Sequence, residues 1–187
     1  MSKIDEIIEY NKHFVEDKKY EEFVTTRYPN KKIVIVTCMD TRLVELLPKA
    51  MNLRNGDAKF IKNAGAIVTQ PFGNIMRSIL IAVYELQAEE VIIIGHHECG
   101  MASLNSEQTI QKMKERGISE DVINTLTHSG LSFSRWLKGF DSVKDSVIQS
   151  VQIVRNHPLL AKDVAVHGMI VDPKTGELEV VVDGSLR

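Results

Sequence analysis

The fold of this chain is decided by the stretch Lys32-Ile33-Val34-Ile35-Val36-Thr37-Cys38-Met39-Asp40-Thr41-Arg42 (residues 32–42). Its first six residues are mostly β-branched and almost wholly apolar, which is typical of a strand that is buried on both faces. Strands of this kind belong to parallel sheets that are covered by helices on both sides. The stretch therefore predicts an α/β fold, with Cys38 at the carboxyl end of a buried strand.

A second stretch of the same kind follows later in the chain. Val91-Ile92-Ile93-Ile94 (91–94) is continued directly by Gly95-His96-His97-Glu98-Cys99-Gly100 (95–100). In an open parallel sheet the carboxyl ends of the strands share one edge, and functional sites form in the crevice beyond it. We therefore expect Cys38, His96 and Cys99 to lie close together.

The rest of the chain alternates strand and helix patterns around these two stretches. Strands are predicted at 32–37, 58–62, 90–95, 164–172 and 178–183. Helices are predicted at 74–87 and 142–155, with a short helix that begins at Leu43 and ends near Pro48. Strands separated by helices imply a mostly parallel sheet, and a hairpin turn at 172–176 adds one antiparallel edge strand.

Two further segments are helical without intervening strands. Residues 3–24 carry apolar side chains at helical spacing among many charges, which predicts an amphipathic helix broken near Asn11 or Asp17. Residues 102–140 have no strand pattern, and we expect helical pieces there with breaks at Gly117, Gly130 and Gly139.

Composition and charge argue against several classes of protein. The formal net charge of −2 gives no electrostatic footprint for nucleic acid or another polyanion. No apolar run approaches the ~20 residues of a membrane span, and the start of the chain lacks the apolar core of a secretory signal. We therefore expect a cytoplasmic protein without nucleic-acid or membrane partners, whose two cysteines remain reduced thiols.

The two cysteines and one histidine can supply a metal site. Cys38, His96 and Cys99 offer two thiolates and an imidazole, a donor set that suits zinc. Three protein ligands leave a fourth position open, which is the arrangement of a catalytic zinc. Two alternatives remain open at this point. Cys38 and Cys99 could form a redox pair, and a cysteine in a buried strand often serves only as a small apolar side chain.

Three motifs together resemble those of the β-class carbonic anhydrases, in particular the short microbial type. They are Cys38-Met39-Asp40-Thr41-Arg42, Asn63-Ala64-Gly65 and Gly95-His96-His97-Glu98-Cys99-Gly100, which occur in the family's order and at similar separations. The resemblance spans about residues 30–183. It implies reversible hydration of carbon dioxide to bicarbonate and a proton, at one zinc ion per chain held by Cys38, His96 and Cys99.

The same resemblance implies a fold and an assembly. The expected fold is a Rossmann-like sheet of four parallel strands plus one antiparallel edge strand, with helices on both faces. Residues 1–30 would form an N-terminal helical arm of the same domain that packs on the partner of a homodimer, and residues 31–187 the zinc-binding α/β catalytic domain. That the helical arm packs on its own subunit remains the alternative. Higher homo-oligomers also remain open.

Roles for further residues follow from the resemblance. Arg42 would clamp Asp40, whose carboxylate then orients the nucleophile, whereas in a second, closed state Asp40 itself would fill the fourth zinc position. Gly65 and Gly100 would bring backbone N–H groups close enough to bind bicarbonate oxygens. Carbon dioxide would occupy a small apolar pocket, expected to be lined by Ile67, Val68 and Met101.

The chain also departs from the family's usual pattern. His97-Glu98 replaces the small and polar pair common there, so the charge around the pocket is expected to differ, and Met101 replaces a glycine. Two other functions are consistent with the same residues. One is zinc-dependent hydrolysis of carbon disulfide or carbonyl sulfide, and the other is zinc binding without turnover.

Overall fold

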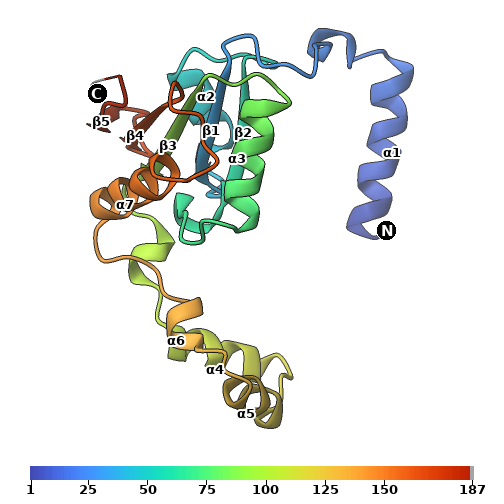
Figure 1. Ribbon diagram of the computed structural model, residues 1–187. Coiled ribbons are helices and arrows are strands. Elements are labelled where there is room, and N and C mark those ends of the chain that lie inside the picture. The colour runs from blue at the N-terminus through green and yellow to red at the C-terminus, as the bar shows by residue number, and fades with distance from the viewer. Residues whose placement is uncertain (186–187) are drawn as a thin grey trace.

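A central sheet organises the molecule, whose structure is a computed structural model that describes residues 1–185. Its five strands are β1 (Ile33–Cys38), β2 (Ala58–Asn63), β3 (Glu90–His96), β4 (Ala165–Val171) and β5 (Leu178–Val182). They lie in the order β2-β1-β3-β4-β5, and only β5 runs antiparallel to its neighbour (Figure 1). The predicted α/β fold with four parallel strands and one antiparallel edge strand is thereby confirmed.

Seven α-helices complete the described chain. They are α1 (Lys3–Glu16), α2 (Leu43–Ala50), α3 (Asn74–Tyr84), α4 (Ser106–Glu115), α5 (Glu120–His128), α6 (Phe133–Trp136) and α7 (Val143–Arg155). Short 3₁₀ turns occur at η1 (Glu21–Phe23), η2 (Ala64–Ala66) and η3 (Gly100–Ser103). Within residues 1–185, none of the helices has the length and apolar character needed to cross a bilayer.

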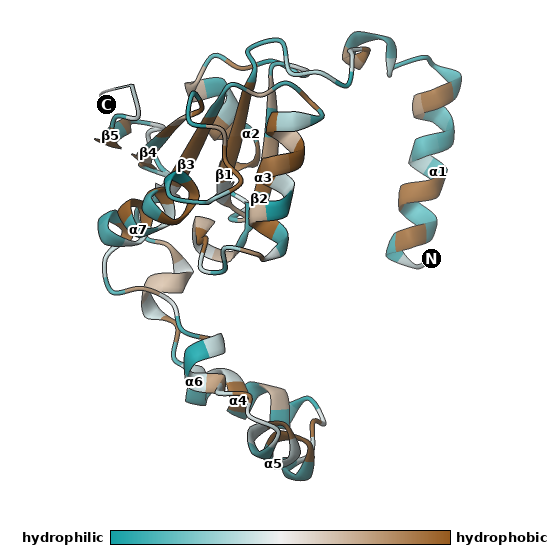
Figure 2. Cartoon of the chain, viewed as in Figure 1, coloured by the Kyte–Doolittle hydropathy of each residue, from teal (hydrophilic) through white to brown (hydrophobic). Residues whose placement is uncertain are grey.

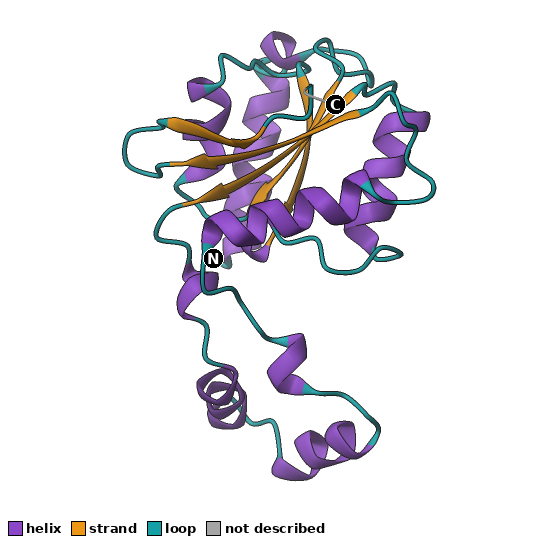
Figure 3. Ribbon diagram, turned by 60° about the vertical axis from the view of Figure 1, so that its left-hand side comes forward, coloured by secondary structure: helices purple, strands orange, loops and turns teal. Residues whose placement is uncertain are grey.

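The sheet buries both of its faces, as the apolar strand pattern predicts (Figure 3). On one face, α3 and α7 pack against the strands through side chains that include Ile79, Val147, Val34 and Ile93. On the other face, Leu43 and Leu47 of α2 pack with side chains that include Ile35, Ile94 and Cys38. Because each face has its own apolar layer, successive residues of β1 are buried whichever way they point.

The chain changes direction across the sheet between β1 and β3. From β1 it crosses to β2 at one edge, and after β2 it returns to form β3 on the other side of β1. This is the topological switch point of a doubly wound sheet, where the loops after the two strands diverge and leave a crevice. Cys38 ends β1 and His96 ends β3, so both residues lie at that crevice.

Two helix ends differ from the prediction. Helix α2 continues past Pro48 to Ala50, because the Met51 amide still donates to the Leu47 carbonyl at 3.1 Å. Only the bond that Pro48 would have donated is lost, and the packing of Leu43 and Leu47 in the core supports the short helix. Helix α3 ends at Tyr84 and not near residue 87, since Gln87 adopts a left-handed conformation with φ of 61° and turns the chain toward β3.

Two helical segments stand away from the sheet (Figure 1). Helix α1 ends at Glu16 with Asp17 as its C-cap, so the predicted break falls at Asp17 and not at Asn11. The α4–α6 segment projects from the opposite side, and its breaks occur where predicted, with left-handed φ values of 97° at Gly117 and 100° at Gly130. The predicted division of the chain at residue 30 remains a prediction. The last two residues of the predicted catalytic segment, 186–187, lie outside the described residues.

Candidate metal centre

The three predicted ligands converge at the crevice between β1 and β3. The ligand atoms of Cys38, His96 and Cys99 all lie within 4.8 Å of one another. The two sulfur atoms are 3.9 Å apart and are not joined by a disulfide. All three residues are buried, with only 5%, 1% and 6% of their surfaces exposed. The sequence-based expectation that they meet is therefore confirmed.

The imidazole of His96 is oriented as a ligand. Its Nδ1 lies 2.8 Å from the carbonyl oxygen of His97, so Nδ1 carries the hydrogen and donates it. That tautomer leaves the lone pair of Nε2 free, and Nε2 is buried without a hydrogen-bond partner among residues 1–185. A buried nitrogen lone pair beside two thiols fits a zinc ion in donor chemistry, and the carbonyl that fixes the ring is a typical outer partner of a metal-bound histidine.

The environment makes the two thiols unequal. Burial raises the pKa of Cys38, but the adjacent His96 ring and the backbone amides of Gly65 and Asp40 outweigh burial and lower this pKa to about 7. The Gly65 amide lies 3.3 Å from the Cys38 sulfur. Burial raises the pKa of Cys99 to about 11, and the neighbouring Cys38 sulfur adds to that shift. Cys38 is therefore the thiol that ionises first.

Arg42 clamps Asp40 beside the three ligands. Oδ1 of Asp40 accepts hydrogen bonds from the backbone amide of Arg42 at 2.9 Å and from its Nε at 3.0 Å, while Oδ2 accepts from Nη2 at 2.8 Å. These bonds to Arg42 lower the pKa of Asp40 to about 2, so the carboxylate stays ionised. Oδ2 also lies 3.8 Å from Nε2 of His96. Of the two states left open for Asp40, this structure shows the one in which Arg42 holds the carboxylate.

A pocket of about 540 Å³ opens over these groups. Apolar side chains from Met39, Met101 and Leu104 line it together with Asp40, Arg42, Gly65 and Gly100. Met101 takes the predicted place in its wall. Val68 does not, because it is buried in the core on the α3–α7 side of the sheet, and Ile67 borders other hollows.

The two glycines of the pocket differ in role. Gly65 has a left-handed φ of 79°, and a Cβ there would lie 2.9 Å from the Met101 side chain, so a larger residue would be strained and crowded. Its amide donates to the sulfur of Cys38, and the expected contact with bicarbonate remains a prediction. At Gly100, a Cβ would meet no atom within 4 Å, so the space beside it is open.

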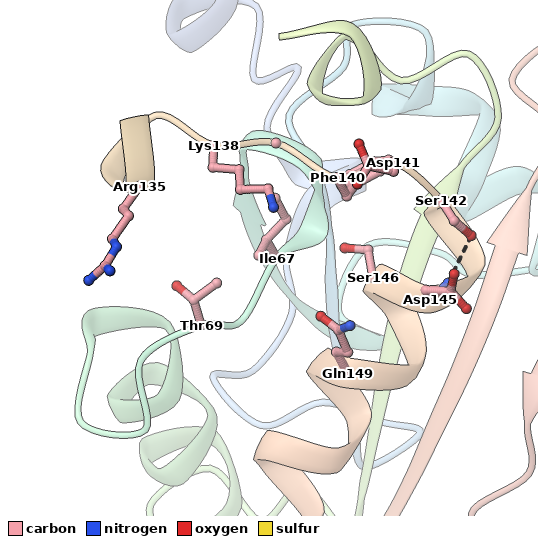
Figure 4. Close-up of a pocket in the computed structure, with 11 residues that line it drawn as sticks. Ile67, Thr69, Arg135, Lys138, Phe140, Asp141, Ser142, Asp145, Ser146 and Gln149 are labelled. Carbon is pink, nitrogen blue, oxygen red and sulfur yellow. Dashed lines mark hydrogen bonds between the residues drawn. The ribbon is translucent and has the colours of Figure 1, made fainter. Parts of the chain in front are cut away.

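A second hollow of about 360 Å³ lies at the start of α7 (Figure 4). Its walls include Ile67, Lys138, Asp141, Ser146 and Gln149. The hydroxyl of Ser142 accepts from the Asp145 amide at 3.2 Å there, which caps α7. Apart from Ile67, this hollow contains none of the residues predicted for the site.

Sequence reasoning missed two residues beside the site, Glu98 as a partner of Arg42 and Lys174 as a partner of Glu98. The carbonyl oxygen of Glu98 accepts from Nη2 of Arg42 at 3.1 Å, and the Glu98 carboxylate lies 3.5 Å from Nη1. Lys174, from the turn between β4 and β5, bonds the same carboxylate. The unusual His97-Glu98 pair was a signal for Glu98, but no local pattern pointed to Lys174.

The fold and the site define an α/β protein with a candidate Cys-His-Cys metal centre at the switch point of its sheet. Three comparisons agree on its family. The carbonic anhydrase family pattern matches residues 33–178. The Bacillus subtilis protein named "Putative carbonic anhydrase YvdA" is 59% identical over 184 residues, covering 98% of this chain and 93% of the relative.

Two other relatives show the range of the group. A carbon disulfide hydrolase from Acidithiobacillus thiooxidans is 32% identical over 157 residues, covering 80% of this chain and 76% of that protein. The crystal structure of β-carbonic anhydrase isoform I from Trichomonas vaginalis superposes with a TM-score of 0.89 at 32% identity, covering 98% of this chain and all of that one. This chain belongs to the β-carbonic anhydrase family.

Proposed function

We propose that this protein catalyses the reversible hydration of carbon dioxide at one zinc ion, held by Cys38, His96 and Cys99. One observation carries the proposal: these three ligand atoms converge beside an Asp40 carboxylate that Arg42 already clamps. A redox role for the two thiols is less well supported, because it gives no function to the free Nε2 of His96 or to the clamped carboxylate.

A bound zinc ion supplies a Lewis acid that makes hydroxide available near neutral pH. The protein's own residues supply orientation. Asp40 is ionised and therefore accepts a hydrogen bond from the nucleophile, which turns the oxygen lone pair toward the substrate. Arg42 holds that carboxylate in place, and the apolar side chains of Met39, Met101 and Leu104 surround an uncharged linear substrate.

The reaction must also release a proton. The water oxygen adds to the carbon of carbon dioxide, one carbon–oxygen π bond opens onto its oxygen, and the product is bicarbonate with one proton in excess. With a pKa of about 2, Asp40 does not hold that proton near neutral pH. The proton therefore passes to solvent or buffer through the open side of the pocket.

Carbon disulfide or carbonyl sulfide hydrolysis is the second candidate. The Acidithiobacillus thiooxidans relative is named a carbon disulfide hydrolase. Apolar side chains in the pocket wall can also contact a linear molecule whose end atoms are sulfur. The chemistry differs in the product, because hydrolysis of these substrates releases hydrogen sulfide.

One experiment separates these functions. Zinc content is measured on the purified protein, and the same sample is assayed by stopped-flow for carbon dioxide hydration and by sulfide release from carbon disulfide and carbonyl sulfide. We expect about one zinc per chain and rapid hydration. Sulfide release without hydration would establish the second candidate, whereas bound zinc with no turnover of any substrate would identify a homologue that only binds metal.

We also propose a homodimer in the cytoplasm, in which α1 covers the partner. Helix α1 buries none of its residues on its own chain, and Ile4, Ile7 and Ile8 leave 61%, 61% and 51% of their surfaces exposed (Figure 2). An apolar helix face of this kind is favourable only when another surface covers it. The reducing cytoplasm keeps the free thiols available as ligands.

A further inference from the structure

Glu98 occupies the turn between two proposed ligands in an uncommon backbone conformation. Its φ of 54° is left-handed, which a residue with a side chain seldom adopts. This conformation accompanies a double contact with Arg42, because Nη2 donates to the Glu98 carbonyl at 3.1 Å and Nη1 lies 3.5 Å from Oε2. Arg42 is therefore held from two sides, by Asp40 and by Glu98.

Lys174 extends this contact to a third part of the chain. Its Nζ lies 2.5 Å from Oε1 of Glu98. Its position is fixed by the turn, since Oδ1 of Asp172 accepts from the amides of Lys174 at 2.7 Å and of Thr175 at 2.9 Å. The β4–β5 turn thus connects to Asp40 through Lys174, Glu98 and Arg42.

We propose that Glu98 and Lys174 are positioning residues, which orient the Arg42 guanidinium so that it keeps Asp40 in the clamped state. Neither side chain belongs to the three-ligand group, and neither lines the pocket. Without the Glu98 charge, Nη1 of Arg42 loses its carboxylate neighbour and the guanidinium gains freedom to turn. Of the two measurements below, only that of kcat depends on the proposed hydration activity.

The size of the effect follows from exposure. The side chains of Glu98 and Lys174 are 55% and 66% exposed, whereas that of Asp40 is 19% exposed. Exposed ion pairs are weak and are screened by salt. We therefore expect changes of about two- to fivefold, and not loss of function.

The test uses Glu98→Gln and Lys174→Met in the full-length protein. Glu98→Gln keeps the length of the side chain and the carbonyl contact but removes the charge. A matched control is the exposed pair on α2, Glu45 and Lys49, whose Nζ–Oε2 distance is 2.9 Å and which lies outside the Arg42 contacts. The control variants are Glu45→Gln and Lys49→Met.

The first readout is the solvent exchange rate of the Arg42 Nε–H, followed by ¹⁵N NMR in the zinc-loaded and metal-free protein. We expect Glu98→Gln to raise this rate about two- to fivefold. Lys174→Met should have a smaller effect, and none in the Glu98→Gln background, because it acts through Glu98. The α2 variants should leave the rate unchanged.

The second readout is kcat at low and at about 0.5 M salt. High salt should lower kcat of the wild type toward that of Glu98→Gln, while the variant responds little. Wild-type exchange rates in both variants would overturn the proposal, even if the protein hydrates no carbon dioxide. If Glu98→Gln disturbs folding, Lys174→Met still tests the proposal, because the Lys174 side chain is exposed and lies on a turn that carries none of the three proposed ligands.

Discussion

The sulfur atom of Cys38 lies 3.9 Å from that of Cys99, although 61 positions separate the two residues. Pairing of β1 with β3 explains this proximity, since the register brings Thr37 opposite Ile94, just before both strands end. The pairing of β1 with β3 therefore brings these two sulfur atoms together.

Replacing either cysteine should remove the metal. Loss of a residue that only hydrogen-bonds a metal ligand typically weakens metal binding 10- to 100-fold. Because each cysteine is proposed to bind the zinc directly, we expect Cys38→Ser and Cys99→Ser each to weaken zinc binding about 100-fold or more. Metal content after dialysis, with circular dichroism to confirm folding, measures the effect. Full zinc occupancy in either variant would place the ion elsewhere.

Zinc affinity should rise with pH. The pKa of Cys99 is raised to about 11, so its proton is displaced on binding at any pH below that value. Cys38, with a pKa of about 7, contributes a second proton only below pH 7, and His96, whose pKa is also raised, contributes on the acid side. We expect about a tenfold gain in affinity per pH unit between pH 8 and 9, and a steeper gain below 7. Competition with a chelator across pH measures this slope, and a flat profile would contradict the assigned thiol states.

Asp40 should affect turnover and not metal binding. Asp40→Asn retains the shape of the side chain but presents an amide to Arg42, which disrupts the clamp. We expect kcat to fall about 100-fold, the cost of a misoriented reacting group, while zinc remains bound. Parallel assays of kcat and metal content test this, and loss of zinc in the variant would assign Asp40 to metal binding instead.

Two glycines near the pocket should respond differently to alanine. A Cβ at Gly139 would lie 1.7 Å from the backbone oxygen of Met101, so one of the two segments must move. We expect Gly139→Ala to lower the free energy of unfolding by about 1–3 kcal/mol. Gly100→Ala is the control, because a Cβ there meets no atom within 4 Å. Equal denaturant midpoints for the two variants would show that the close approach is not needed.

The exposed face of α1 should control assembly. Ile7→Asp places a charge in the apolar face, and we expect it to convert dimers to monomers at micromolar concentration. Lys12→Ala, on the same helix, is the control and should remain dimeric. Light scattering coupled to size-exclusion chromatography gives the mass, and a dimeric Ile7→Asp variant would remove α1 from the interface.

Local pattern was sufficient to predict the sheet and the convergence of Cys38, His96 and Cys99. The apolar runs at β1 and β3 indicate strands buried on both faces, and the strand ends of parallel neighbours must share an edge. Cys38 and His96 close those two strands, so their meeting follows from strand position alone. The two apolar runs were therefore enough to place Cys38 and His96 at strand ends, without knowledge of any contact between them.

Contacts between distant turns could not be predicted in the same way. Lys174 reaches Glu98 across 76 positions, and nothing in either local sequence specifies the partner. The direction of the Gly65 amide depends on its left-handed backbone, which places the N–H toward Cys38. Helix α2 continues past Pro48 because Leu43 and Leu47 pack in the core, so tertiary contacts and not local propensity decide where it ends.

The three proposed ligands come from the ends of β1 and β3 and from the turn after β3, which has a consequence for the protein in the cell. They meet only when β1 pairs with β3, so the complete site requires that this pairing has formed. A zinc ion bound at the proposed site would stabilise the native chain in proportion to the logarithm of the free zinc concentration above the dissociation constant. We therefore expect zinc starvation to raise the unfolded fraction of the protein and so to speed its degradation.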